Sequence, residues 1–242
     1  MKSKYDEMHK AGVSSWFSQG EEERQLILKM GEPWEGLQVL EIGCGEGDLA
    51  NTISELGNII WAVDYSQEAI DRAIKKYPDS PAMFGCKGYA TLVGRYDRIV
   101  MQGVLEHLDD PFTELKWMMD NLLTEKGDVI TSSPCFLNPR GIVWMTLDML
   151  GAVMSKTDLH YLNPWEFEEF CEKNDYGIEI EFCDSSWGNG RGMIEDFRKR
   201  LPLALGDGGI KFKQSKINKF LEWLDLVPCD AVGATAVYRI TK

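Results

Sequence analysis

The sequence has little histidine, no paired cysteine motif and no long apolar run. The three histidines in 242 residues, His9, His107 and His160, leave few candidates for an imidazole base. The six cysteines form no C-x-x-C pair and no metal-ligand spacing, which favours reduced thiols over disulfides. The most apolar run, residues 141–154, is too short to span a bilayer and contains Asp148. The first ten residues lack the apolar core of a secretory signal, so we expect a cytoplasmic chain without a membrane span.

The sequence also lacks a basic stripe. The chain carries 26 Lys and Arg against 39 Asp and Glu, a formal net charge of −13. Its most basic segments, residues 198–200 and 211–219, are interpreted as solvated helix faces. Such a surface repels a phosphate backbone, so nucleic acid is an unlikely partner and a small molecule is the expected one. With 44% hydrophobic residues, the length suits one α/β core, and we predict a single domain over residues 1–242.

Strand patterns alternate with helix patterns from Leu37 onward, which indicates a doubly wound, mostly parallel α/β sheet. Ser66, Asp110 and Asn163 are predicted to begin helices. Ligands of such sheets bind beyond the carboxyl ends of the strands. The predicted strands are Gln38–Ile42 and residues 58–63, 82–84, 98–101, 128–132, 178–183 and 233–241.

A glycine-rich turn follows the first predicted strand. Its pattern is G-x-G-x-G, formed by Gly43, Cys44, Gly45, Glu46 and Gly47, rather than the G-x-G-x-x-G of dinucleotide sites. The nearby carboxylates of Glu41, Glu46 and Asp48 would oppose a pyrophosphate. S-adenosylmethionine, which joins an adenosine to a sulfonium and an amino-acid tail, fits better. The glycines would let the backbone approach that tail, and Glu41 would lie near its ammonium group.

The second predicted strand ends at Asp64 and Tyr65. A carboxylate at Asp64 can accept hydrogen bonds from both ribose hydroxyls, a role shared with NAD enzymes. Tyr89, after the third strand, and Gln102, after the fourth, complete the predicted cofactor site. The full cofactor-binding prediction comprises Glu41, Gly43, Cys44, Gly45, Gly47, Asp64, Tyr65, Tyr89 and Gln102.

These motifs resemble those of the class I S-adenosylmethionine-dependent methyltransferases. "VLEIGCGEG" and "AVDYSQEAI" are similar to the first two motifs of that family. "YDRIVMQGVLEHLDDP" resembles the strand-4 motif of the branch that includes ubiquinone-biosynthesis O-methyltransferases, and "DLHYLNPWEFEEFCEKNDYGIEI" resembles a pattern of small-molecule and glycan-modifying members. The resemblance covers residues 37–183 and the last strand. It implies a seven-stranded Rossmann-like sheet, with an antiparallel final strand and a helical cap.

Two positions depart from the family pattern. Tyr89 stands where many members place an Asp or Asn that binds the adenine amino group, so stacking, its hydroxyl or backbone amides would have to read adenine. Gly103 stands where the ubiquinone branch has a Glu that resembles part of a metal site. Glu106 and His107 remain, and two ligands seldom hold a metal well. We therefore predict no metal.

Two histidines are the predicted catalytic residues. His107 follows the fourth strand, where a hydroxyl acceptor would need a base, and His160 follows the apolar cap segment. Either one could be the base, and structural roles remain open for both. The predicted accessory segments are an N-terminal helical lid (residues 1–36), the cap (134–162) and a variable insertion (185–228) with one helix near residues 214–226. Residues 188–192, "GNGRG", are expected to form a mobile loop.

Methyl transfer to a hydroxyl oxygen of a small molecule is the function these features favour. A transfer RNA methyltransferase acting on wobble uridine is an alternative, opposed by the charge of −13. A non-catalytic binder of S-adenosylmethionine is another. An NAD-dependent oxidoreductase is disfavoured by the glycine spacing and the carboxylates. The sequence leaves the acceptor, the methylated atom and the oligomeric state open.

Overall fold

The computed structural model describes residues 20–152, 158–226 and 231–242, and its centre is one seven-stranded sheet. The strand order is β3-β2-β1-β4-β5-β7-β6. Neighbours from β3 to β5 pair in parallel, and β7 pairs antiparallel with both β5 and β6. The predicted fold class is confirmed. The strands are β1 Gln38–Ile42, β2 Ile59–Asp64, β3 Met83–Cys86, β4 Tyr96–Gln102, β5 Leu123–Pro134, β6 Gly177–Cys183 and β7 Thr235–Thr241.

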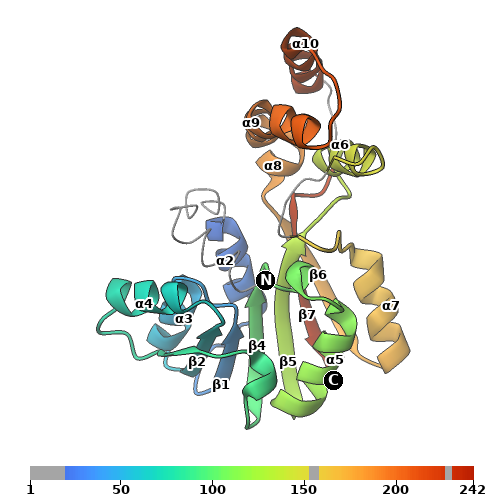
Figure 1. The fold of residues 1–242 in the computed structure, drawn as a ribbon. Helices are drawn as coiled ribbons and strands as arrows, with labels where there is room; N and C mark the ends of the chain where they lie inside the picture. Colours follow the sequence, from blue (N-terminus) through green and yellow to red (C-terminus); the bar gives the residue numbers. More distant parts are fainter. Residues whose placement is uncertain (1–19, 153–157, 227–230) are drawn as a thin grey trace.

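Helices cover both faces of this sheet (Figure 1). Helices α2 (Gly20–Met30), α3 (Asp48–Glu55) and α4 (Gln67–Lys76) bury apolar side chains on one face, against Val39, Ile60 and Val100 among others. Helices α5 (Pro111–Leu122) and α7 (Pro164–Asn174) cover the other face. Two short 3₁₀ turns, η2 (Tyr89–Thr91) and η3 (Leu105–His107), follow β3 and β4. The result is the three-layer arrangement expected of alternating strands and helices.

The helix starts follow from local capping. The Ser66 hydroxyl accepts a hydrogen bond from Ala69 N at 3.3 Å, and Asp110 Oδ1 accepts one from Thr113 N at 3.3 Å. Asn163 and Glu166 form a reciprocal capping box at the start of α7. These side chains satisfy backbone N–H groups that the first helical turn leaves without partners. All three predicted helix starts are confirmed.

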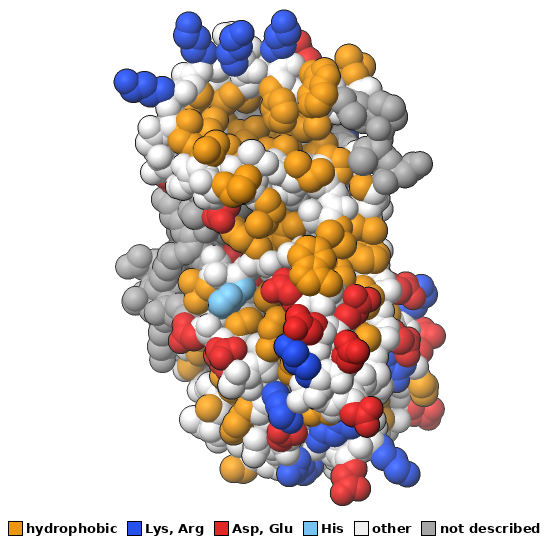
Figure 2. Space-filling view, turned by 90° about the vertical axis from the view of Figure 1, so that its right-hand side faces the viewer, with side chains coloured by type: hydrophobic (Ala, Val, Ile, Leu, Met, Phe, Trp, Pro, Cys, Tyr) orange, Lys and Arg blue, Asp and Glu red, His pale blue; other side chains and the backbone are white. Residues whose placement is uncertain are grey.

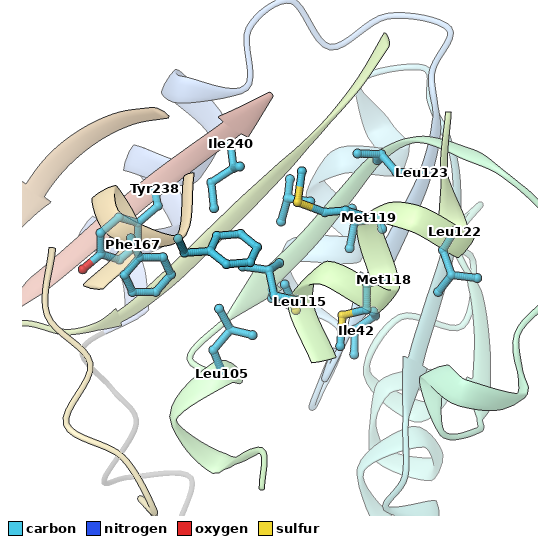
Figure 3. Close-up of a cluster of buried hydrophobic side chains, with 14 of the residues drawn as sticks. Ile42, Leu105, Leu115, Met118, Met119, Leu122, Leu123, Phe167, Tyr238 and Ile240 are labelled. Atoms are coloured by element: carbon cyan, nitrogen blue, oxygen red, sulfur yellow. The ribbon is translucent and has the colours of Figure 1, made fainter. Parts of the chain in front are cut away.

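The core beneath α5 and α7 is dense and apolar. Figure 3 shows Leu105, Leu115, Met118 and Met119 gathered with side chains from the sheet. Phe167 of α7 stacks on Tyr238 of β7, with ring centroids 3.7 Å apart and planes 15° apart. Both residues are fully buried. This stacking packs α7 against β7, the strand that runs antiparallel to both of its neighbours.

A second group of helices stands apart from the sheet layers (Figure 1). It consists of α6 (Pro139–Asp148), α8 (Ser185–Asn189), α9 (Arg191–Asp207) and α10 (Gln214–Asp225), which we call the cap. The cap has its own apolar core, in which Trp144 of α6 meets Phe197 of α9 edge to face at 5.4 Å. The predicted cap segment and the predicted insertion therefore fold together, although they are separate in the sequence.

Two expectations about this region are wrong. Residues 188–192 are not a loop: the first two lie in α8, Gly190 caps α9, and the last two begin it. The insertion contains α8 and α9 in addition to the predicted helix. Sequence reasoning missed α9 because Pro202 and two glycines, Gly192 and Gly206, weaken its helical pattern. Buried packing against α6 and α10 overrides those local preferences.

The cap is tied firmly to the sheet. Asn138 Nδ2 donates to the carbonyl oxygens of Cys135 and Gly233 at 3.0 and 2.9 Å, and Cys135 N donates to Ala234 O at 2.8 Å. A Cβ on Gly233 would lie 1.6 Å from Cys183 O, so the chain passes there only as glycine. The ends of β5 and β6 and the approach to β7 are thus joined where they enter the cap. Across the described residues, no helix is long and apolar enough to cross a membrane.

Candidate active site

The glycine turn after β1 is shaped by close contacts. Gly43, Gly45 and Gly47 have φ of +75°, +52° and +83°, a region that favours glycine. A Cβ on Gly43 would lie 2.6 Å from Val104 in the loop after β4, and one on Gly47 would lie 2.7 Å from Phe84 of β3. A Cβ on Gly45 would meet no described atom within 4 Å. Two glycines therefore pack the turn against neighbouring strands, and the third faces open space.

Asp64, the last residue of β2, holds this turn. Its Oδ2 accepts a hydrogen bond from Gly45 N at 3.1 Å, and its Oδ1 accepts one from Ser66 N at 2.8 Å. The carboxylate is 8% exposed. Each carboxylate oxygen can accept two hydrogen bonds, so a carboxylate at this position can serve backbone donors and ligand hydroxyls together. The carbonyl of the next residue, Tyr65, accepts from Cys86 Sγ at 3.5 Å.

Glu41 is the buried carboxyl group at the end of β1. It is 2% exposed, and its Oε2 has no hydrogen-bond partner among the described residues. Burial, with the carboxylates of Asp64 and Asp48 nearby, raises the pKa of Glu41 to about 8. A buried polar atom without a partner costs stability, which is tolerated where a ligand supplies the partner. A cationic ligand group would satisfy this atom.

The other two carboxylates of the turn have cation partners from helices. Glu46 pairs with Arg72 of α4 at 3.3 Å. Asp48 pairs with Lys76 at 2.8 Å and with Arg24 of α2 at 3.4 Å. These cations offset the negative charges of Glu46 and Asp48, so Glu41 is the carboxyl group of the turn that most disfavours a phosphate.

The side chain of Gln102 joins the end of β4 to helix α2. Gln102 Nε2 donates to Glu23 Oε2 at 2.7 Å and to Gly20 O at 3.3 Å. Burial raises the pKa of Glu23, against the opposing effect of hydrogen bonds from Ser132 and Gln102. Sequence reasoning missed Glu23 because it lies 79 residues before its partner Gln102. Glu23 also belongs to the acidic first turn of α2, and acidic residues there are commonly explained by their favourable interaction with the helix dipole.

The Glu106-His107 pair lies on η3, next to the return of the chain from the cap. Backbone N–H groups of Leu159 and His160 donate to Glu106 O at 2.8 and 3.2 Å. His107 Nδ1 lies 3.5 Å from Asp158 Oδ1, and both side chains are largely buried, at 19% and 13% exposed. Asp158 was not predicted, because only the fold brings residue 158 to residue 107.

Glu106 and His160 have different surroundings from His107. Glu106 Oε2 is buried without a partner in the described part of the chain, and burial, with Asp158 nearby, raises the pKa of Glu106. His160 Nε2 lies 3.1 Å from the carbonyl oxygen of Asp109. That contact braces the returning chain against the loop after η3. The geometry therefore distinguishes a histidine with a carboxylate partner from one with a carbonyl partner.

Other residues of the predicted cofactor site, and Arg140 of the cap, have structural contacts. The Tyr89 hydroxyl donates to Glu114 of α5, and its ring lies 5.8 Å from that of Trp117. The Cys44 side chain is buried in the core under α2, α3 and α4, so only its backbone faces the turn. Arg140 of the cap is buried and pairs with Asp196 of α9 at 3.4 Å. The ligand roles of Tyr65, Tyr89, Cys44 and Gln102 stay predictions. His9 lies outside the described residues.

A family model described as a methyltransferase domain matches residues 19–177, about two thirds of the chain and all of the elements around the glycine turn. The chain belongs to the methyltransferase domain family. The motif-based assignment to the class I S-adenosylmethionine-dependent methyltransferases is confirmed, and with it S-adenosylmethionine as the cofactor. The residues fit that group: Glu41 offers a buried orphan carboxyl oxygen to its ammonium, Gly45 an open approach, and Asp64 acceptors for its ribose.

Curated relatives of this methyltransferase include ubiquinone biosynthesis O-methyltransferases. The mitochondrial protein of Saccharomyces cerevisiae is 28% identical over 122 residues, which are 48% of this chain and 38% of that protein. The protein of Caulobacter vibrioides is 26% identical over 142 residues, 55% of this chain and 50% of that protein. The match thus spans half or less of these relatives' length.

Solved structures with the same fold have more varied functions than the O-methyltransferases above. A coclaurine N-methyltransferase matches with a TM-score of 0.61 at 14% identity, covering 90% of this chain and 71% of that one. The [4+2]-cyclase SpnF matches with a TM-score of 0.59 at 16% identity, covering 90% and 79%. A magnesium protoporphyrin IX methyltransferase from Synechocystis matches with a TM-score of 0.52 at 13% identity, covering 90% and 76%. At these identities the likeness shows the fold alone.

Metal ions in proteins are held by sets of ligand side chains. Across residues 20–152, 158–226 and 231–242, no group of three His, Cys, Asp or Glu side chains could hold a metal ion. Gly103 has φ of +62°, and its backbone N–H donates to Ser132 Oγ at 3.1 Å. A glutamate at that position would have to adopt a strained backbone. The prediction of no metal stays a prediction.

Proposed function

We propose that this chain transfers the methyl group of S-adenosylmethionine to a hydroxyl oxygen of a small-molecule acceptor. The observation that carries the proposal is the pairing of His107 with Asp158 in a loop that contacts the glycine turn through Val104 and Gly43. A cofactor turn and a histidine with a carboxylate partner thus share one edge of the sheet. That combination suits removal of a proton from an acceptor beside the methyl donor.

Three residues have distinct roles at the cofactor end of the site. Asp64 accepts from the ribose hydroxyls while it holds Gly45 N, so the same carboxylate shapes the turn and binds the ligand. Gly45 permits close approach of the backbone to the amino-acid tail. Glu41 pairs with the ammonium group and loses its proton as the ligand binds. When bound, S-adenosylmethionine supplies a methyl group activated by a sulfonium.

The acceptor end relies on His107. With Nδ1–H donating to Asp158, Nε2 is the basic nitrogen of the ring. Nε2 would accept the proton of the acceptor hydroxyl and hold it as the imidazolium, while the bound cofactor would supply the methyl group to the oxygen. Asp158 stabilises the resulting cation and fixes the orientation of the ring.

The small-molecule hydroxyl acceptor is supported by two observations. The curated relatives named above are O-methyltransferases, although they cover only part of this chain. The chain that returns from the cap passes beside His107 through Leu159 and His160, so this returning segment borders the acceptor side. An acceptor pocket formed between cap and sheet would exclude water from the transfer.

The test is methyl transfer to a panel of hydroxyl compounds. The full chain would be incubated with S-adenosylmethionine and phenols, catechols and sugars, with S-adenosylhomocysteine formation as the readout. We expect acceptor-dependent product with at least one phenol or sugar, and its loss in His107→Ala. Product from amines or thiols with no product from any hydroxyl would contradict oxygen as the methylated atom. Tight cofactor binding without any product across the panel would favour the non-catalytic alternative.

A further inference from the structure

Helix α10, at the far end of the cap, has two opposite faces. Ile217, Leu221 and Leu224 are buried against the rest of the cap. Four other residues recur at intervals of three and four, and so lie along one outer stripe of the helix. Within that stripe Trp223 is 59% exposed and Leu226 is 80% exposed. The outer stripe consists of Lys216, Lys219, Trp223 and Leu226.

The chain directly before α10 has a similar composition. Lys211 and Lys213 are exposed, and between them Phe212 is 41% exposed. Lysines interleaved with a tryptophan, a phenylalanine and a leucine are typical of helices that lie in the interface of a lipid bilayer. The ring of a tryptophan sits at the headgroup level, and lysine stems reach past apolar side chains to place their charge there.

The charge of the chain is divided between its two ends. Residues 191–226 carry eight Lys and Arg against five Asp and Glu, a formal charge of +3. The rest of the chain carries eighteen against thirty-four, a charge of −16. Figure 2 shows Lys and Arg along the end where Figure 1 places α10, apolar side chains beside them, and most Asp and Glu on the opposite half. An anionic surface would attract this end and repel the other.

We propose that the outer stripe of α10 binds the surface of an anionic lipid bilayer, with the sheet directed away from it. Charge complementarity selects the lipid, because the cationic lysines suit anionic headgroups and the exposed Trp223 and Leu226 suit the acyl boundary. A second copy would have to bring its acidic half to this stripe, a head-to-tail contact rather than a symmetric dimer. An RNA could stack bases on Trp223 but would leave Leu226 without an apolar partner, and it would be repelled by the acidic remainder of the chain. The proposal is independent of the acceptor.

The experiment is co-sedimentation of the full chain with vesicles. One set contains phosphatidylcholine alone, and the other contains phosphatidylcholine with about one third phosphatidylglycerol. We expect the protein to sediment with the anionic vesicles only, and to be released as salt is raised, since screening weakens surface attraction. Each lysine near an anionic surface contributes about fivefold to partitioning. The double variant Lys216→Glu/Lys219→Glu should therefore bind at least about tenfold more weakly.

Matched variants on the sheet half control for total charge and for loss of an exposed tryptophan. Lys75→Glu/Lys126→Glu makes the same charge change at two exposed positions of the sheet layers. Trp165 of α7 is 52% exposed, so Trp165→Ala matches Trp223→Ala. The α10 variants should lose vesicle binding while both controls keep it. Wild-type protein that stays in solution with anionic vesicles would overturn the proposal, as would equal loss in the control variants. Transfer RNA binding or dimerisation that the α10 variants abolish, without vesicle binding, would assign the stripe to that other partner.

Discussion

The amide nitrogen of Gly45 donates to Asp64 Oδ2 across 3.1 Å, so the carboxylate at the end of β2 holds the glycine turn that follows β1. The two cofactor motifs of the sequence are therefore one structural unit. A change at either residue acts on both the shape of the turn and the acceptors available to a ligand. The controls for such changes must separate these two effects.

The affinity for S-adenosylhomocysteine, which keeps the ammonium group, should depend on pH through Glu41. Burial raises the pKa of Glu41 to about 8, so the free protein holds it mostly protonated at neutral pH. Binding needs the carboxylate, and its fraction falls tenfold for each pH unit below the pKa. Affinity measured by calorimetry should therefore rise by up to about tenfold per unit between pH 6 and 7.5 and level off near pH 8. In Glu41→Gln the slope should vanish, and an unchanged slope would exclude Glu41 as its source.

Asp64→Ala should weaken binding of S-adenosylhomocysteine by about 2 kcal/mol, roughly thirtyfold, because hydrogen bonds to a charged acceptor are lost. Ser66→Ala is the control. It removes the cap of α4, at a cost of about 1 kcal/mol of folding free energy, without touching the proposed ribose acceptors. Calorimetry should show near wild-type affinity in the Ser66 variant alone. Equal affinity in all three proteins would remove the ribose role from Asp64.

Gly45→Val should reduce cofactor affinity by at least about tenfold, because a branched side chain would occupy the open space above the turn. Its backbone, at φ of +52°, would also be strained. Gly57→Val serves as the control for strain, since Gly57 has φ of +87° and an open Cβ position at the end of α3. Both variants should lose thermal stability, and only the Gly45 variant should lose affinity. Normal binding by a folded Gly45→Val protein would contradict the close approach.

His107→Ala should lower turnover by about 10² to 10⁴, the usual contribution of a positioned base, with cofactor affinity nearly intact. The wild-type rate should fall at acid pH as the imidazole becomes protonated, and that acidic limb should be absent in the variant. Asp158→Asn should lower turnover less and shift the limb to lower pH, because the partner that favours the imidazolium is lost. His160→Ala is the comparison. If it abolishes turnover while His107→Ala only reduces stability, the two histidines have exchanged roles.

Turnover should survive exhaustive chelation. The motivating residue is Gly103, whose φ of +62° disfavours the glutamate that a third ligand would require. The rate would be measured with a responsive acceptor before and after treatment with a chelator, and again after Mg²⁺ or Zn²⁺ is added back. Activity that disappears and returns only with a metal would show that a cation site exists.

Much of the sheet was predictable, because its signals are local. Buried strands such as Gln38–Ile42 are short, mostly apolar runs. Ser66 and Asp110 are N-cap residue types, which predict that a helix begins after them. The ends were less certain: β5 extends from Leu123 to Pro134, beyond the predicted residues 128–132. Pairing with β7 reaches Pro134, and Leu123 pairs with Tyr96 of β4 across a register shift.

The site was only partly predictable, because its key pairings are distant in the sequence. Glu41, Gly45 and Asp64 could be found from motif spacing. The ion pair between Arg72 and Glu46 forms because α4 packs beside the glycine turn. The contact between Asp158 and His107 forms because the chain returning from the cap packs beside η3. No spacing rule connects such residues, and the cap helix α9 likewise owes its formation to its neighbours more than to its own composition.

The joined entry of three strands into the cap has a consequence for protein engineering. Asn138 binds Gly233, and Gly233 passes against Cys183, so segments from three parts of the chain meet at one crossing. A chimera that exchanges residues 134–162 alone would separate Trp144 from Phe197 and Arg140 from Asp196. Recombination with a relative therefore has to move both inserted segments together, with cut points inside β5, β6 and β7.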